Sequence, residues 1–161
     1  MITVVLPTHN SAARLVYVLS LLVPAAVDGL VKSVVFADAA STDATLDIAE
    51  DSGAMVVTVQ GDIGTRLAAG CAAAKGTWIL ALGEELSLPE NWRVAVEAHL
   101  AGGGGKPALI AAPGLFGLPG RPLAVLASRD AVAAARGFKP GGDPLRALLG
   151  RLKPKAVRLR V

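Results

Sequence analysis

The sequence has one cysteine and few aromatic residues, and both shortages limit what the protein can be. Cys71 alone can form neither an internal disulfide nor a cysteine-based zinc site, and its alanine-rich surroundings indicate a small buried hydrophobic side chain. Only 4% of the 161 residues are aromatic although 53% are hydrophobic, so Ala, Val, Leu and Ile must fill the interior. That composition is typical of buried parallel strands.

Long apolar runs and a leader sequence are also missing. The longest charge-free stretches, residues 15–27 and 107–120, are interrupted by Pro or Gly and are shorter than the roughly 20 apolar residues of a membrane span. The start, MITVVLPTHN, lacks the basic residues and the small-residue cleavage site of a signal peptide, and it reads as a strand. We therefore expect no transmembrane segment and a cytoplasmic location.

Charge is divided unevenly along the chain. Residues 1–120 hold 6 Lys/Arg and 11 Asp/Glu, whereas residues 121–161 hold 10 Lys/Arg and 2 Asp. Such a basic segment suits a phosphorylated partner or an anionic membrane surface. In the second case the protein would be peripheral at the inner face of the membrane. The alternative is a basic face that is simply solvated. Nucleic acid is not expected, because aromatic residues are not interleaved with the basic ones and no binding module is recognisable.

Apolar runs of strand length alternate with stretches of helical period, which indicates an α/β fold with a mostly parallel, Rossmann-like central sheet and flanking helices. Strands are predicted over residues 2–6, 33–37, 54–59, 77–82, 108–112, 123–127 and 156–161. Helices are predicted over residues 12–22, 44–52, 65–75, 89–100, 128–136 and 143–151, with Pro24 ending the first. A glycine run at 102–105 predicts a hinge inside a single domain, 1–161, between a larger part, 1–100, and a shorter part, 106–161.

Polar segments follow three of the predicted strands. They are PTHN at 7–10, DAASTD at 38–43 and GEE at 83–85. In open parallel sheets ligands bind outside the carboxyl ends of the strands, so these segments should line a site. In the second segment Ser41, Thr42 and Asp43 are expected to cap the following helix.

Three stretches resemble, in order and spacing, the signature blocks of glycosyltransferase family 2. They are VVLPTHN at 4–10, VVFADAASTDAT at 34–45 and GTRLAAGCAAAKGTWILALGEELSLPENW at 64–92, and the third is also similar to that of short bacterial transferases in the family. The resemblance implies a GT-A fold, a nucleotide-diphosphosugar donor and Mg²⁺ or Mn²⁺. A divalent cation or an arginine would stabilise the charge that develops on the diphosphate leaving group.

The resemblance also assigns roles on the donor side. Asp38 would bind the nucleoside, and Pro7, Thr8 and Asn10 would shape the first loop of the nucleotide site. Arg66 aligns with a basic residue near the diphosphate and stands at a predicted helix N-terminus, which favours anions. The alternatives are a loop-forming aspartate and a surface arginine.

The chain departs from the family pattern in two of these blocks. Ala39 and Ala40 stand where the family has Asp and Gly, so part of the base contact is absent. Gly83-Glu84-Glu85 replaces Asp-x-Asp, which leaves Glu85 and Glu84 as the candidate metal ligands; a solvated acidic turn is the alternative.

The later sequence SRDAVAAARGFKPGGDPLRALLGRL at 128–152 resembles the family's acceptor-side block. Asp143 would then be the general base that takes the proton of the acceptor hydroxyl, although Asp143-Pro144 is also a favourable N-cap and N1 pair. The sequence thus predicts a glycosyltransferase with an unidentified acceptor. The alternative is a catalytically degenerate GT-A-like domain that binds a nucleotide or a protein partner without turnover. A nucleotidyltransferase is disfavoured, because PTHN is not a glycine-rich basic phosphate loop.

Overall fold

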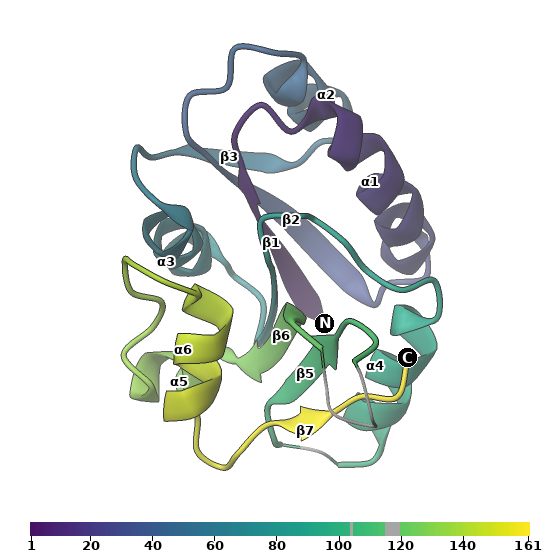
Figure 1. Cartoon of the computed structure of the whole chain (residues 1–161). Coiled ribbons are helices and arrows are strands. Elements are labelled where there is room, and N and C mark those ends of the chain that lie inside the picture. Colours follow the sequence, from purple (N-terminus) through teal and green to yellow (C-terminus); the bar gives the residue numbers. More distant parts are fainter. Residues whose placement is uncertain (104, 115–119) are drawn as a thin grey trace.

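A single sheet runs through the computed structural model, which describes residues 1–103, 105–114 and 120–161 (Figure 1). Its seven strands lie in the order β3-β2-β1-β4-β6-β5-β7. Their bounds are β1 Ile2–Thr8, β2 Val31–Asp38, β3 Met55–Thr58, β4 Trp78–Leu82, β5 Ala108–Ala111, β6 Pro122–Ser128 and β7 Val157–Arg158. Both predicted parts of the chain therefore contribute strands to one sheet.

Strands β1 to β4 are mutually parallel, which confirms the mostly parallel α/β prediction. Every residue of β1 is buried, as expected for a central strand whose two faces are both covered. The direction reverses at β6, which pairs antiparallel with both β4 and β5. Because of this reversal, the beginning of β6 lies at the same edge of the sheet as the end of β4.

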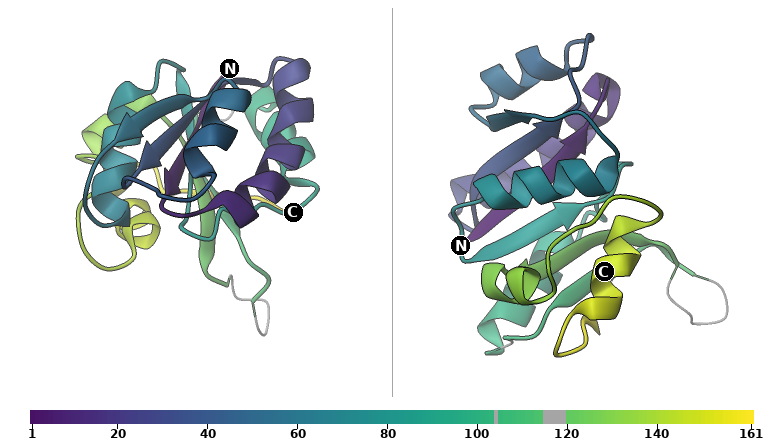
Figure 2. Two further views of the ribbon diagram at one scale, coloured as in Figure 1. Left: turned by 90° about the horizontal axis from the view of Figure 1, so that it is seen from above. Right: turned by 90° about the vertical axis from the view of Figure 1, so that its left-hand side faces the viewer.

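Helices cover both faces of the sheet, giving three layers (Figures 1 and 2). Helices α1 (Ala12–Val27), α2 (Thr45–Asp51) and α4 (Trp92–Ala101) enclose the larger core, which contains Phe36 and Trp92. Helices α3 (Ile63–Ala73), α5 (Arg129–Ala134) and α6 (Pro144–Arg151) enclose the other core, around Leu67 and Leu148. Throughout the described ranges, no helix combines the length and apolarity needed to cross a membrane.

Pro24 does not end the first helix, and that prediction is wrong. Helix α1 continues to Val27 with Pro24 inside it. Pro24 has no N–H to donate to the Ser20 carbonyl. Both residues lie on the exposed side of the helix, where water can hydrate that carbonyl. Leu22 and Ala25 meanwhile extend the buried stripe, so burial outweighs the lost hydrogen bond.

Several other boundaries differ from the predicted ones, and three of the differences have a clear physical cause. Strand β1 extends to Thr8 because its ladder with β2 continues to the Thr8–Asp38 pair. Helix α4 begins at Trp92, since the Trp92 N–H donates to the Pro89 carbonyl in a separate turn. Strand β7 is only Val157–Arg158, because β5 offers pairing at those two positions alone. In the glycine run at 102–105 that predicted a hinge, Gly102 is the C-cap of α4 and Gly104 lies outside the described residues.

Helix α3 packs very closely on the sheet at Gly70. A Cβ atom added there would lie 2.5 Å from Val5 Cγ1 and 3.2 Å from the Ala37 Cβ. The helix that carries Arg66 is therefore held directly against β1 and β2 by a position that tolerates no side chain.

We predict that Gly70→Ala lowers the free energy of unfolding by about 1–3 kcal/mol through overpacking. The matched control is Gly150→Ala in α6, where an added Cβ meets nothing within 4 Å and should stabilise the protein by up to about 1 kcal/mol through helix propensity. Urea denaturation measures both changes. Equal stability of the Gly70 variant and the parent would contradict the close packing of α3.

Candidate nucleotide-sugar site

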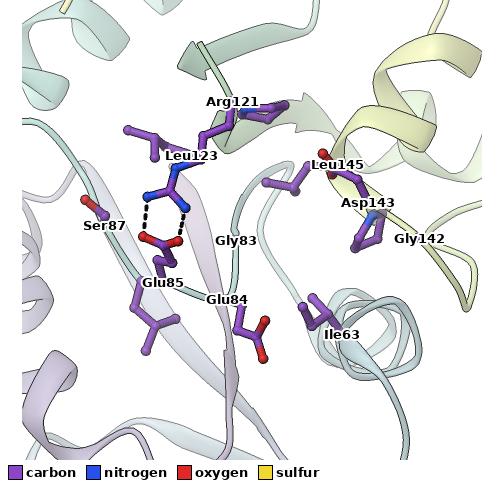
Figure 3. Close-up of a pocket in the computed structure, with 13 residues that line it drawn as sticks. Ile63, Gly83, Glu84, Glu85, Ser87, Arg121, Leu123, Gly142, Asp143 and Leu145 are labelled. Carbon is purple, nitrogen blue, oxygen red and sulfur yellow. Dashed lines mark hydrogen bonds and ion pairs between the residues drawn. The ribbon is translucent and has the colours of Figure 1, made fainter. Parts of the chain in front are cut away.

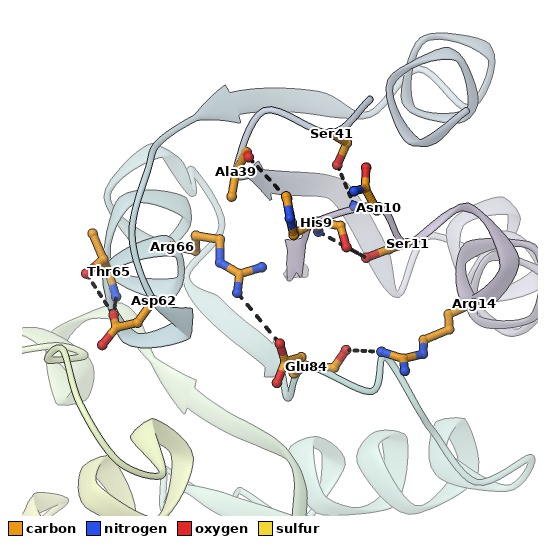
Figure 4. A network of polar contacts seen from close by, with 10 residues as sticks. All are labelled: His9, Asn10, Ser11, Arg14, Ala39, Ser41, Asp62, Thr65, Arg66 and Glu84. Carbon is orange, nitrogen blue, oxygen red and sulfur yellow. Dashed lines mark hydrogen bonds and ion pairs between the residues drawn. The ribbon is translucent and has the colours of Figure 1, made fainter. Parts of the chain in front are cut away.

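The three polar segments predicted to line a site lie together at one edge of the sheet (Figure 4). They follow β1, β2 and β4, whose parallel direction brings their carboxyl ends to the same edge. The first two segments each contain a non-glycine residue with positive φ, Asn10 at 48° and Ala40 at 56°, and Leu86 at 49° directly follows the third. Such conformations cost free energy and persist only where surrounding contacts impose them.

Asp38 is fully buried at the centre of this edge. Its Oδ1 accepts hydrogen bonds from the Thr8 hydroxyl at 2.7 Å and the Ser41 hydroxyl at 2.6 Å, and its Oδ2 accepts the Ser41 N–H at 2.7 Å. These hydrogen bonds satisfy the oxygen atoms of a carboxyl group that is excluded from water. In the free protein Asp38 therefore joins the ends of β1 and β2, and its predicted nucleoside contact stays a prediction.

The first loop is held by the second through side chains on both. Asn10 Oδ1 accepts the Thr42 N–H at 2.8 Å, and the Asn10 N–H donates to the Ser41 hydroxyl at 2.8 Å. Ser41 thus organises the two loops rather than capping a helix. Pro7 and Thr8, also predicted at the nucleotide site, are buried residues at the end of β1.

Asp43 lies where two helices begin. Its Oδ1 accepts the Thr45 N–H at 3.0 Å at the start of α2, and its Oδ2 accepts the Ala12 N–H at 3.1 Å at the start of α1. Hydrogen bonds from Thr45 and Ala12 hold the pKa of Asp43 below its usual value. The N-cap residue of α2 is Ala44, so the predicted caps at Thr42 and Asp43 are wrong: Thr42 contacts Asn10, and Asp43 accepts one N–H at the start of each helix from the preceding loop.

Arg66 lies in the first turn of α3, as the sequence predicted, but it is buried, with 6% of its surface exposed. Among the described residues its Nε has no hydrogen-bond partner. Its Nη2 is 3.9 Å from Glu84 Oε1, a long ion pair, and Figure 4 shows the guanidinium facing the space between His9 and Glu84. A buried, incompletely satisfied guanidinium at the start of a helix is suited to an anion.

The start of α3 is also clamped by the loop before α6. Asp62, the N-cap of α3, accepts the Gly141 N–H through Oδ2 and the Thr65 N–H through Oδ1. Hydrogen bonds from Thr65 and Gly141 hold the pKa of Asp62 below its usual value. A Cβ added at Gly64 would lie 2.0 Å from the Lys139 carbonyl oxygen, so the loop rests directly on the helix.

A pocket of about 200 Å³ lies between the turn after β4 and the start of α6 (Figure 3). It brings together three predicted site residues, Glu84, Glu85 and Asp143, and adds Arg121, which the sequence analysis did not identify. Its other lining residues are Ile63, Gly83, Leu86, Ser87, Pro122, Leu123, Gly142, Pro144 and Leu145. The predicted metal and base residues therefore share one cavity.

Both carboxylate oxygens of Glu85 accept hydrogen bonds from Arg121, through Nη1 and Nη2 (Figure 3). Arg121 immediately precedes β6, whose antiparallel direction brings this end to the carboxyl edge of β4. No motif in the sequence indicates this position. Arg14 was also missed; its Nη1 donates to the Glu84 carbonyl at 3.3 Å.

Asp143 is the N-cap of α6, as the Asp143-Pro144 pair predicted. Its Oδ1 accepts the Arg146 N–H at 3.0 Å, and Arg146 Nε lies 3.5 Å from its Oδ2. The carboxylate also lines the pocket. Because an N-cap can line a pocket as well, the predicted role of Asp143 as general base stays a prediction.

No set of three or more His, Cys, Asp or Glu side chains is gathered closely enough, within the part of the chain that is described, to hold a metal by itself. Glu84 and Glu85 nevertheless offer carboxylate oxygens, the ligands that Mg²⁺ and Mn²⁺ prefer. Mg²⁺ is commonly held by one or two carboxylates together with substrate phosphates. The residues present therefore fit a cation that binds with a diphosphate.

No family model matches this sequence, and no curated protein matches it. Solved structures do match. Glucosyl-3-phosphoglycerate synthase from Mycobacterium tuberculosis in complex with UDP gives a TM-score of 0.74 at 23% identity, covering 98% of this chain and 69% of that chain. The complex of the same synthase with Mn²⁺ and UDP-glucose gives a TM-score of 0.73 at 25% identity, and the match covers 99% of this chain and 69% of that chain. TarS from S. aureus gives a TM-score of 0.76 at 17% identity, and the match covers 97% of this chain and 57% of that chain. The chain has the GT-A fold of these proteins, as the resemblance implied.

We predict that Asp38→Asn lowers the free energy of unfolding of the ligand-free protein by about 1–3 kcal/mol, because an amide N–H₂ would face hydroxyl and N–H donors in a buried site. Asp51→Asn, at an exposed position in α2, is the control and should change stability by less than about 0.5 kcal/mol. Urea denaturation without nucleotide measures both. A fully stable Asp38 variant would show that the network does not support the fold.

Proposed function

We propose that this chain is a glycosyltransferase that moves a sugar from a nucleotide-diphosphosugar to an acceptor. The observation that carries this proposal is Arg66, a buried guanidinium at the carboxyl edge of a GT-A sheet whose Nε has no hydrogen-bond partner among the described residues. Structures normally leave few buried donors unsatisfied, and phosphate oxygens would complete this one. The Mycobacterium tuberculosis synthase was crystallised with UDP and UDP-glucose, which supports a uridine nucleotide as the first donor to test.

On the donor side, residues 1–100 would bind the nucleotide. Asp38 would act mainly through the loops it holds, because both of its oxygens are engaged in the free protein. Pro7, Thr8 and Asn10 would support the same surface from the end of β1. Arg66 would contact the diphosphate.

A divalent cation, Mg²⁺ or Mn²⁺, would be held by Glu85 or Glu84 together with the donor phosphates. When bound, it would supply positive charge that stabilises the departing diphosphate. The Mn²⁺ in the structures of the synthase supports this cofactor. Arg66 would add a fixed positive charge on the neighbouring side of the turn.

On the acceptor side, residues 106–161 would contribute Asp143 as general base. Its carboxylate lines the same pocket as the acidic turn and could take the proton of an acceptor hydroxyl. The basic surplus of this part of the chain supports an acceptor that is phosphorylated or held at a membrane surface.

A second candidate is a degenerate GT-A domain that binds nucleotide or a protein partner without turnover. The observation that favours it is the pairing of the acidic turn, because Glu85 is engaged by Arg121 and Glu84 faces Arg66.

A panel of UDP, GDP, TDP and CDP in thermal-shift assays, with and without Mn²⁺, tests binding, since a ligand at 100 Kd raises the free energy of unfolding by about 2.7 kcal/mol. Consumption of sugar nucleotide then separates the two candidates.

We predict that Arg66→Met weakens binding of the preferred nucleotide about 10- to 100-fold, because charged hydrogen bonds to phosphate are lost. The unfolding free energy of the ligand-free variant should not fall, since an incompletely paired buried charge is replaced by an apolar side chain of similar size. Lys75→Met, an exposed position just after the same helix, is the control and should bind as the parent does. Calorimetric titration and urea denaturation measure the two effects, and unchanged binding by the Arg66 variant would remove it from the site.

We predict that Asp143→Asn keeps the cap of α6 and most of the stability but lowers sugar transfer or donor hydrolysis by roughly 10²-fold or more, because an amide cannot accept the proton. Asp143→Ala should lose the activity and also about 1 kcal/mol of stability. Melting temperature and sugar-nucleotide turnover separate the two roles. A fully active Asn variant would make Asp143 purely structural.

A further inference from the structure

The Glu85–Arg121 ion pair occupies the pocket where the proposed cation would bind (Figure 3). Its two parallel hydrogen bonds engage both carboxylate oxygens, the geometry in which arginine binds a carboxylate most strongly. The side chains of Arg121 and Glu85 are 53% and 51% exposed, so the pair can exchange partners without unfolding its surroundings.

Backbone pairing carries Arg121 to this place. The Gly83 N–H, in the acidic turn, donates to the Leu123 carbonyl at 2.8 Å, and Leu82 pairs with Ala124 across β4 and β6. The Arg121 carbonyl in turn accepts the Ala112 N–H at 3.0 Å. The arginine is therefore part of the sheet framework that also holds the turn, and its approach to Glu85 follows from the antiparallel strand.

We propose that Arg121 is an internal competitor of the divalent cation at Glu85. The inference rests on the proposed function, in which Glu85 is a metal ligand. A guanidinium and a divalent cation on one carboxylate repel each other, so cation binding at Glu85 displaces Arg121. The displaced guanidinium remains in the pocket that also contains Asp143, where it can bind an anionic group of a substrate. Because linkage is reciprocal, an anion that binds Arg121 there strengthens cation binding at Glu85.

The test is a titration with Mn²⁺ at low ionic strength, read by the electron paramagnetic resonance signal of free Mn²⁺, with and without UDP. Arg121→Gln should bind Mn²⁺ about three- to tenfold more tightly than the parent, in keeping with the modest strength of exposed ion pairs. Glu85→Gln should weaken binding. In the Glu85→Gln background, adding Arg121→Gln should change affinity less than twofold, because the competition needs both side chains.

Arg129→Gln is the matched control. Arg129 directly follows the opposite end of β6, beyond the Trp78–Ser128 pair, and its loss changes the net charge equally without touching the pocket. It should leave Mn²⁺ affinity within twofold of the parent. The proposal is overturned if Arg121→Gln behaves like Arg129→Gln, if its tightening persists in the Glu85→Gln background, or if neither the parent nor Arg121→Gln binds Mn²⁺. Failure of the proposed function has a different signature, the absence of UDP binding in every variant, whereas UDP binding together with a Mn²⁺ affinity that Arg121→Gln leaves unchanged overturns the competition alone.

Discussion

A carboxylate that is excluded from solvent has to be satisfied by the protein, and at Asp38 this requirement shapes the whole carboxyl edge of the sheet. Its three hydrogen bonds come from the end of β1 and from the loop after β2. Ser41, which supplies two of them, also accepts the Asn10 N–H, so the first loop is fixed by the same network. Asp43 then ties the starts of α1 and α2 together. The positive φ values of Asn10 and Ala40 are the conformational cost of this arrangement.

Features that depend on local pattern could be predicted from the sequence. The apolar runs predicted the four parallel strands, β1 to β4, and their shared direction placed the segments after β1, β2 and β4 at one edge. The Asp143-Pro144 pair predicted the start of α6. Features decided by tertiary contacts could not be predicted. Pro24 is tolerated because of which side of α1 it faces, and Arg121 meets Glu85 only because β6 is antiparallel.

The basic surplus of the last quarter of the chain is not a uniform charged surface. Arg121 neutralises Glu85 in the pocket, and Arg146 lies beside Asp143. Arg151 is partly buried and donates to the carbonyls of Ala135 and Gly137, which ties α6 to the segment after α5. Part of the basic charge of this segment is therefore used in contacts within the protein, and the proposed phosphorylated or membrane-bound acceptor would have to bind the remaining basic residues.

The two departures from the glycosyltransferase family 2 pattern have different structural consequences. Ala40 replaces a glycine yet adopts the left-handed conformation, so the loop after β2 takes its shape despite the added Cβ. At Gly83, where the family has the first aspartate of its metal motif, a Cβ atom would lie 3.3 Å from Leu145 Cδ1, so α6 packs into space that a longer side chain would need. The loop after β2 thus has an ordered shape, while the acidic turn packs against α6 and is paired with Arg121. Under the proposed function, nucleotide binding would depend on the loops after β1 and β2 and metal-assisted transfer would depend on the acidic turn, so the two properties could vary independently.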